Sequence, residues 1–217
     1  MFLSEKELWL FLHNGNSMVG NIENSYEECR IVRRLICLVL VINILLIFMP
    51  GKSYCADSKV ELDWDYLTHA SFKDRYIDTV SLHILENISK KDNWSIYRGI
   101  TITRPYGYIN NDNHQMKDSS AVGVGPVYMI RNEKKLSRKL SESLDMSGGF
   151  IVYDKIFPAE GRYYNFMWRI GPRFTYKISE NSSVSIGYML MHVSNGFRTH
   201  NPGYNGQGVS VGFVEKF

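Results

Sequence analysis

Hydrophobic and polar side chains alternate with a period of two along the latter part of the chain. From Tyr164 to Ile178 every even position holds an apolar residue or proline, and most odd positions hold a polar one. After a short polar run the even positions are again apolar up to Leu190, and His192 and Ser194 follow in the same phase. Successive side chains of a β-strand point to opposite faces. The pattern therefore predicts two long strands whose apolar face also carries an imidazole and a hydroxyl.

The same alternation divides the rest of the chain into further strands. Apolar residues occupy even positions from Val60 onward, and only the last segment, from Val209, shifts to odd ones. These segments show no comparable helical period. Eight strands are predicted, near residues 58–69, 75–86, 93–105, 120–131, 142–155, 163–178, 183–196 and 207–217.

Strands of this length and spacing, each with an apolar and a polar face, are typical of a transmembrane β-barrel. The rival is a soluble sandwich or a lipocalin-like barrel, whose apolar face would point inward. The chain ends on Phe217 in an alternating strand, which resembles the C-terminal signature of bacterial outer-membrane proteins. The polar face carries charges that can pair inside a narrow lumen: Glu61, Asp63, Asp65, Asp145, Arg169, Arg173 and Lys177. We therefore predict an all-β fold, an eight-stranded antiparallel outer-membrane β-barrel that is too narrow for an open pore.

Connectivity predicts the orientation of the hairpins. If both ends of the barrel segment are periplasmic, the turn at 180–182 is periplasmic and the loop at 197–206 is extracellular. A proline cannot donate to a strand ladder, so we expect a bulge at Pro172. The connection from Asn132 to Ser141 is long and basic for a periplasmic turn, and the pattern does not explain it.

A leader is expected before the barrel. Basic residues precede an apolar core at 35–49, and small and polar residues follow, which is typical of a secretory signal peptide. We assign residues 1–56 to the leader and 57–217 to one barrel domain. All three cysteines lie in or beside the leader, so the barrel has neither a disulfide framework nor a thiol nucleophile.

Composition excludes several kinds of function. A net charge of +3 is too small to indicate nucleic-acid binding. The six histidines are scattered without repeated ligand spacing, so neither a metal site nor another cofactor is expected. The 14 Tyr, 11 Phe and 4 Trp suit the aromatic girdles of a membrane protein.

His192 and Ser194 form a candidate catalytic pair. Residues two apart on a strand share a face at roughly 7 Å, and an imidazole can span that gap to activate a serine. A second pair, His69 and Ser71, lies at the end of the first strand and is interpreted as an ordinary rim loop. The alternative for His192 and Ser194 is a pair of interfacial polar residues beside lipid headgroups.

The segment His192-Val193-Ser194-Asn195-Gly196, followed by Asn201 to Asn205, resembles the His-x-Ser-Asn motif of the PagL-type lipid A 3-O-deacylases. The resemblance implies an outer-membrane esterase that removes the acyl chain at position 3 of lipid A, within lipopolysaccharide, from the outer leaflet. By position, Ser194 would be the nucleophile and His192 the base. Asn195 and Gly196 would support the site, and Asn201 would donate to the oxyanion.

One departure from that family concerns the residue that orients His192. Better-known members place a glutamate downstream of the serine, whereas this chain has no acid there. A neutral amide can orient a histidine, so Asn205 and Gln207 are candidates. A hairpin closing over 197–206 would set Gln207 near Ser194, and Glu160 could reach across from the preceding loop.

Two other functions stay open at this stage. The same pair of side chains would serve a phospholipase, since both substrates are acyl esters. A non-catalytic small barrel for envelope integrity or adhesion would need neither side chain. The sequence also leaves open whether the barrel acts as a monomer or a homodimer.

Overall fold

The computed structural model describes residues 59–70, 74–110, 115–196 and 201–216, all of them in strands or short connections. The expected leader, including the apolar core at 35–49, and Phe217 lie outside these residues. The described elements are β1 (Lys59–His69), β2 (Arg75–Lys91), β3 (Trp94–Asn110), β4 (Met116–Asp118), β5 (Gly123–Lys135), β6 (Leu140–Phe157), β7 (Arg162–Lys177), β8 (Ser182–Ser194) and β9 (Tyr204–Lys216).

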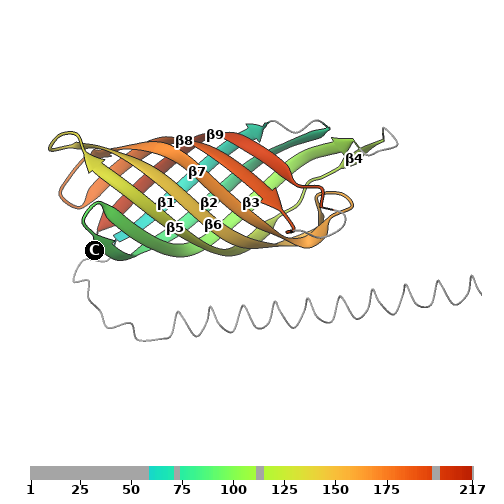
Figure 1. The fold of residues 1–217 in the computed structure, drawn as a ribbon, viewed down its shortest axis with the longest axis horizontal. Helices are drawn as coiled ribbons and strands as arrows, with labels where there is room; N and C mark the ends of the chain where they lie inside the picture. Colours follow the sequence, from blue (N-terminus) through green and yellow to red (C-terminus); the bar gives the residue numbers. More distant parts are fainter. Residues whose placement is uncertain (1–58, 71–73, 111–114, 197–200, 217) are drawn as a thin grey trace, which may run out of the picture. The chain divides into compact units, whose positions relative to one another are not determined.

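Eight of these strands close into a ring. Each pairs antiparallel with its neighbours in the order β1, β2, β3, β5, β6, β7, β8, β9, and β9 pairs again with β1. The three-residue β4 pairs only with β3 and stands outside the ring. The eight-stranded antiparallel barrel predicted from the alternation is therefore confirmed (Figure 1).

The two ends of the barrel differ. Lys59 at the start of β1 pairs with Lys216 near the end of β9, so both lie at one end, together with the short turns after β2, β5 and β7. The opposite end carries β4 and the connections after β1, β3, β6 and β8 (Figure 1). We name this opposite end the loop end.

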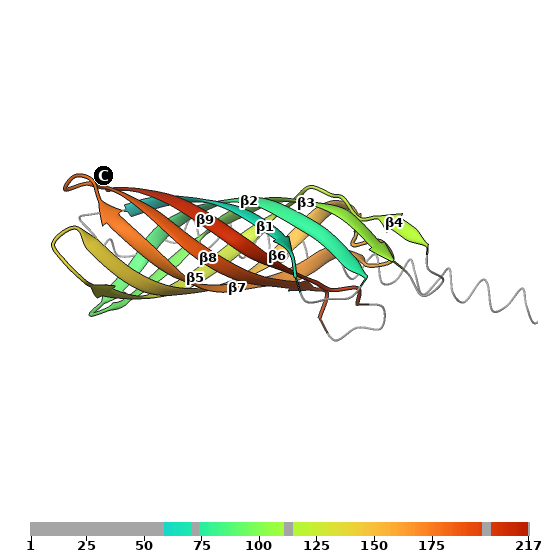
Figure 2. The ribbon, with the colours of Figure 1, turned by 90° about the horizontal axis from the view of Figure 1, so that it is seen from above.

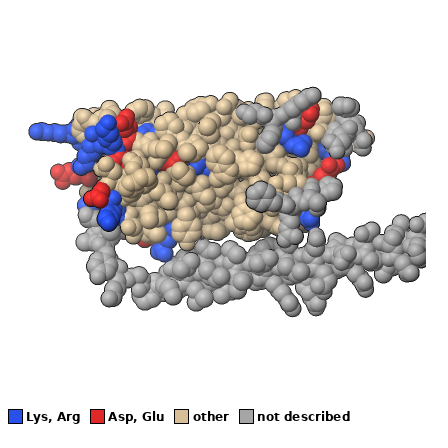
Figure 3. Space-filling model, in the orientation of Figure 1, with Lys and Arg blue, Asp and Glu red and all other residues tan. Residues whose placement is uncertain are grey.

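Side chains divide between the two faces of the wall as the alternation predicts. The even-numbered apolar residues of β1 to β8, and the odd-numbered ones of β9, point outward and most of them are exposed; Trp64, Ile100, Ile186 and Val211 are examples. Charged side chains gather toward the two ends of the barrel, and a broad band with few charges lies between them (Figure 3). An apolar outer band is what a membrane-spanning barrel requires, because lipid tails cannot satisfy polar groups.

The described part of the chain has no helix that is long and apolar enough to span a membrane.

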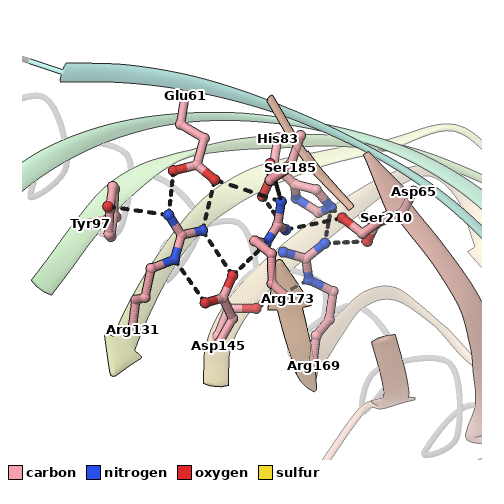
Figure 4. Close-up of polar contacts among 12 residues, drawn as sticks. Glu61, Asp65, His83, Tyr97, Arg131, Asp145, Arg169, Arg173, Ser185 and Ser210 are labelled. Atoms are coloured by element: carbon pink, nitrogen blue, oxygen red, sulfur yellow. Dashed lines mark hydrogen bonds and ion pairs between the residues drawn. The ribbon is translucent and has the colours of Figure 1, made fainter. Parts of the chain in front are cut away.

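A network of buried charges fills the lumen (Figure 4). Arg131 forks between Glu61 and Asp145, with N···O distances of 2.7–2.8 Å. Arg173 contacts Asp63 at 2.8 Å and Asp145 at 2.7 Å. The remaining members extend the network around these pairs: Asp65, His83 and Arg169 form one cluster, and Tyr97, Ser185 and Ser210 bond to the arginines. Because buried charges need partners, this pairing explains how a narrow barrel tolerates a polar interior.

Three details differ from the sequence-based expectations. Lys177 is exposed at the end of β7, so it does not join the lumen network. The bulge expected at Pro172 is absent: Ile170 pairs with Leu190 and Arg173 with Gly187, which is one continuous register. The segment from Asn132 to Ser141 is mostly strand, because β5 and β6 extend into it and leave only residues 136–139 as a turn.

The strands are staggered, so a row of paired residues climbs around the barrel (Figure 2). One such row begins at Val60, near the start of β1, and after a full circuit reaches Asn205, whose carbonyl accepts a hydrogen bond from Ala70, just past the end of β1. The row runs through Val60, Glu86, Arg98, Tyr128, Gly148, Trp168, His192 and Asn205. Every step from β9 back toward β5 therefore moves away from the loop end.

Candidate active site

His192 and Ser194 are the last two outward-facing residues of β8, at the loop end of the barrel. Both are half-buried on the outward face of the wall, the face that carries the apolar band. On the neighbouring β7, Trp168 lies opposite His192 and Phe166 lies opposite Ser194. The two rings of Trp168 and His192 are 5.8 Å apart, centroid to centroid, and are tilted by 37°. The pair is thus set against aromatic side chains rather than in the polar lumen.

Asn205 on β9 holds the imidazole of His192 from the other side. It pairs with His192 in the strand register, and its Oδ1 lies 2.7 Å from Nδ1 of the ring. An amide oxygen can only accept a hydrogen bond, so Nδ1 carries the proton and Nε2 keeps its lone pair. In this tautomer Nε2 is the basic nitrogen, the one that can take a proton from a serine hydroxyl.

Asn201 shapes the loop that follows the serine. Its Oδ1 accepts a hydrogen bond from the backbone N–H of Asn195 at 2.9 Å, and its Nδ2 donates to the carbonyl of Gly196 at 2.8 Å. Gly196 has a φ of +82°, a left-handed conformation that favours glycine. The Asn195 side chain is buried. These contacts fix the backbone immediately after Ser194.

Gly203 provides space beside the pair. A Cβ at this position would lie 3.2 Å from Cβ of Ser194 and 3.6 Å from Cε1 of His192. It would also lie 2.9 Å from the carbonyl oxygen of Val193, closer than a Cβ normally comes to backbone. A methyl group here would be tight against Ser194 and would touch His192 at an ordinary contact distance.

Of the other two candidates for orienting His192, Gln207 lies elsewhere and Glu160 contacts a different partner, Lys117. Gln207 pairs with Leu190, further from the loop end than His192, so the expectation that it lies near Ser194 is wrong. The reason is that β9 begins at Tyr204, which makes the hairpin loop shorter than residues 197–206. Glu160, in the connection between β6 and β7, forms an ion pair with Lys117 of β4.

A further histidine–acid contact among the described residues lies at the end of β1. His69 contacts Asp78 at 3.1 Å through its ring and packs edge-on against Tyr76, which agrees with its interpretation as part of a rim loop; Ser71 lies outside the described residues. Within the described ranges no three His, Cys, Asp or Glu side chains gather in a way that could hold a metal ion.

Sequence reasoning did not single out two neighbours of the pair, Trp168 and Gly203. The alternation predicted Trp168 only as one of many outward-facing aromatic residues. The β7–β8 register places it opposite His192. Gly203 was predicted to lie within the loop. It lies close to Ser194 because β9 begins directly after it, at Tyr204.

Comparison with known proteins gives a family match. The family model described as lipid A 3-O-deacylase (PagL) matches residues 59–214, which covers most of the chain. Curated protein sequences give no significant match.

Solved structures show more distant likenesses. The crystal structure of the outer-membrane enzyme PagL is 14% identical with a TM-score of 0.44, and covers 74% of this chain and 99% of that one. The outer-membrane protein Ail of Yersinia pestis is 10% identical with a TM-score of 0.35, over 74% of this chain and 99% of that one. At these scores neither likeness bears on function, and the assignment of the family rests on the family model.

Proposed function

Because the chain belongs to the lipid A 3-O-deacylase (PagL) family, we propose that this barrel is an outer-membrane serine esterase acting on lipopolysaccharide. The bond cleaved is the ester that joins a 3-hydroxyacyl chain to position 3 of lipid A. Ser194 is the nucleophile and His192 is the base. The observation that carries the proposal is the 2.7 Å hydrogen bond between His192 Nδ1 and Asn205 Oδ1, on the same outward face as Ser194.

The reaction proceeds in two acyl transfers. Nε2 of His192 takes the hydroxyl proton of Ser194 while Oγ attacks the ester carbonyl and forms a tetrahedral intermediate. The intermediate collapses, the bond to the sugar oxygen breaks, and His192 returns the proton to that oxygen. Water, activated by the same imidazole, then hydrolyses the acyl-serine and releases the 3-hydroxy fatty acid.

Asn205 takes the position of the orienting residue. It selects the tautomer of His192 as the acid of a serine triad does, and an amide fills the same role in Cys-His-Asn proteases. Asn201 acts by holding the loop after Ser194, because its amide nitrogen and oxygen both bond to that backbone. Asn201 is also retained as the proposed oxyanion donor, because its amide nitrogen carries a second N–H.

The loop end faces the cell exterior in this proposal. Lipid A lies in the outer leaflet, and the pair lies near the loop end on the lipid-facing wall, at the depth where an acyl ester meets its sugar. No cofactor takes part, since the serine, the imidazole and water supply every step.

The test is the mass spectrum of lipid A treated with the purified barrel. Wild type should release one 3-hydroxy fatty acid, and Ser194→Ala should fold into the same heat-modifiable barrel but lose at least about a thousandfold in rate. His69→Ala, which changes the other His-x-Ser segment, is the matched control and should stay active.

Undiminished release by Ser194→Ala would overturn the mechanism. Unchanged lipid A with wild type would favour a non-catalytic barrel, and release of fatty acid from phospholipid instead would indicate a phospholipase.

A further inference from the structure

The turn between β5 and β6, at the end of the barrel opposite the loop end, carries a concentration of positive charge. Lys134, Lys135, Arg138 and Lys139 follow one another closely there, and all of these side chains are exposed. Lys177, at the end of β7, lies beside them, because its backbone N–H donates to the carbonyl of Lys139 at 2.8 Å. Lys and Arg side chains gather at this end of the molecule in Figure 3. The basic connection that the sequence pattern did not explain is therefore an exposed cationic surface.

The two acidic side chains of this hairpin neutralise only part of the charge. Glu142 pairs with Lys134 at 3.6 Å. Glu133 pairs with Lys90 of β2 at 3.2 Å. The cations of this surface that contact no carboxylate in the described part of the chain, which we call the basic tip, are Lys135, Arg138, Lys139 and Lys177.

The geometry of the turn does not require these cations. The turn at 136–140 and the turn at 178–182, between β7 and β8, have the same hydrogen bonds. In each turn the first two N–H groups donate to the fifth carbonyl, and the hydroxyl of the second residue, a serine, accepts from the fourth and fifth N–H. Where the first turn has Arg138 and Lys139, the second has Glu180 and Asn181. An acid and an amide therefore form the same turn.

Apolar side chains lie beside the basic tip. Leu136 and Leu140 flank the turn, and Tyr176 of β7 is the strand partner of Leu140; all three side chains are exposed. Nζ of Lys139 lies 5.9 Å from the centre of the Tyr176 ring, which is within the range of a cation–π contact. Lys139 thus leans over the outward side of the wall, where the apolar band ends. A ligand that covers this surface meets cations and apolar side chains together.

We infer that the basic tip binds the headgroup of an anionic phospholipid, of the class of phosphatidylglycerol. The phosphate accepts charge-assisted hydrogen bonds from Lys and Arg, and the acyl chains of the same molecule cover Leu136, Leu140 and Tyr176. A free phosphate ion would leave these apolar side chains uncovered. Each cation near an anionic lipid surface adds about fivefold to the affinity. Headgroups bound here hold this end of the barrel at the membrane surface.

The first test compares an anionic with a zwitterionic phospholipid. The purified protein in neutral detergent is titrated with phosphatidylglycerol or with phosphatidylcholine of the same acyl chains, and bound lipid is measured by native mass spectrometry. Wild type should bind phosphatidylglycerol more tightly. Arg138→Glu combined with Lys139→Asn, which copies the turn at 178–182, should raise the Kd for phosphatidylglycerol at least about tenfold and leave that for phosphatidylcholine unchanged.

The matched control makes the same change in net charge at the loop end. Lys117→Asn combined with Lys155→Glu replaces two exposed cations that already pair with Glu160 and Asp118, and it should keep the wild-type Kd. Equal affinity of wild type for the two lipids, or an equal loss in the two double variants, would refute the inference.

The second test locates the bound headgroup. The protein is refolded into phosphatidylcholine vesicles that contain phosphatidylglycerol with a diazirine on its headgroup, and labelled peptides are mapped after irradiation. Labelling should concentrate on residues 134–140 and 176–178, and it should fall in the Arg138→Glu, Lys139→Asn variant and at high salt, which screens charge. Labelling that concentrates at the loop end, or that is the same in the variant, would exclude this site.

This inference does not depend on the proposed esterase. The basic tip lies at the end of the barrel away from Ser194, so its double variant should release fatty acid from lipopolysaccharide in detergent at the wild-type rate. If wild type releases none but prefers phosphatidylglycerol through the basic tip, the esterase fails and the lipid site stands. If release is normal and the variant binds phosphatidylglycerol as wild type does, the esterase stands and the lipid site fails.

Discussion

Asn205 differs in one physical respect from the acid of a serine triad. Its Oδ1 accepts from His192 Nδ1 and so fixes the tautomer, but the neutral amide adds no negative charge beside the imidazolium that forms during catalysis. An acid provides both effects. We therefore expect Asn205 to hold His192 in the correct tautomer and orientation. We expect it to stabilise the imidazolium less than a carboxylate would.

Substituting Asn205 separates the two effects. Asn205→Ala removes the hydrogen bond and should lower kcat by about tenfold to a hundredfold, with the barrel intact, because general-base catalysis depends on the orientation of the ring. Asn205→Asp restores an acceptor with a charge and should match or exceed the wild-type rate. The measurement is the initial rate of fatty-acid release.

Gln207→Ala and Glu160→Ala, measured in parallel, test the two other candidates for the orienting role. A full rate in Asn205→Ala combined with a large loss in either of the other two variants would transfer the orienting role to that residue.

At the scale of elements, the hairpin of β8 and β9 assembles the site. Ser194 ends one strand, and Gly203 immediately precedes the other. Tyr204 anchors the start of β9 inside the barrel, where its hydroxyl lies 3.2 Å from that of Thr79 and its ring packs edge-on against Phe157 at 5.6 Å. With Tyr204 pointing inward, Asn205 must point outward, toward His192.

The spacing within this hairpin should be critical for activity. Gly203→Val would press on Val193, Ser194 and His192, and displacing a nucleophile by a fraction of an ångström to an ångström costs up to about a hundredfold in rate. Gly206→Ala is the control, because its Cβ would face inward, 3.2 Å from Cε of Met191 and from Cβ of Leu67, and would touch neither Ser194 nor His192. Rates of deacylation and circular dichroism of the refolded barrels would be compared; equal rates in both variants would contradict the prediction.

The same hairpin shows how far sequence alone reaches. Alternation identified all eight strands of the ring and their outward faces, because a residue on the wrong face would expose charge to lipid. It placed the start of the last strand three residues late, at 207, because Gly203-Tyr204-Asn205-Gly206 has the composition of a turn. That error left Asn205 as one of three candidates for orienting His192, because its pairing with His192 depends on register and not on residue type.

At the scale of the whole molecule, the lumen is held by charges that are distant in sequence. Arg131 meets Glu61, 70 residues away, and Arg173 meets Asp63, 110 residues away. Alternation could predict that these side chains point inward, but the stagger of the strands decides which of them meet. The pairs therefore follow only from the closed ring.

Removing one member of this network should destabilise the barrel strongly. Arg173→Ala would leave Asp63 buried without its arginine partner and would remove one of the two arginines that contact Asp145, which costs about 3–5 kcal/mol in the free energy of unfolding. Lys90→Ala is the control, because its ion pair with Glu133 is exposed and contributes at most about 1 kcal/mol. Urea unfolding of the refolded barrel in micelles measures both, and equal midpoints would contradict the prediction.

The filled lumen also has a meaning for the cell envelope. Side chains that satisfy one another across the interior leave little room for a column of water, so we expect an inserted copy to add little leak for ions or small solutes. The amount of this protein in the membrane can then rise or fall without changing permeability. A cell that uses such a barrel can tune its surface lipid simply by how many copies it makes.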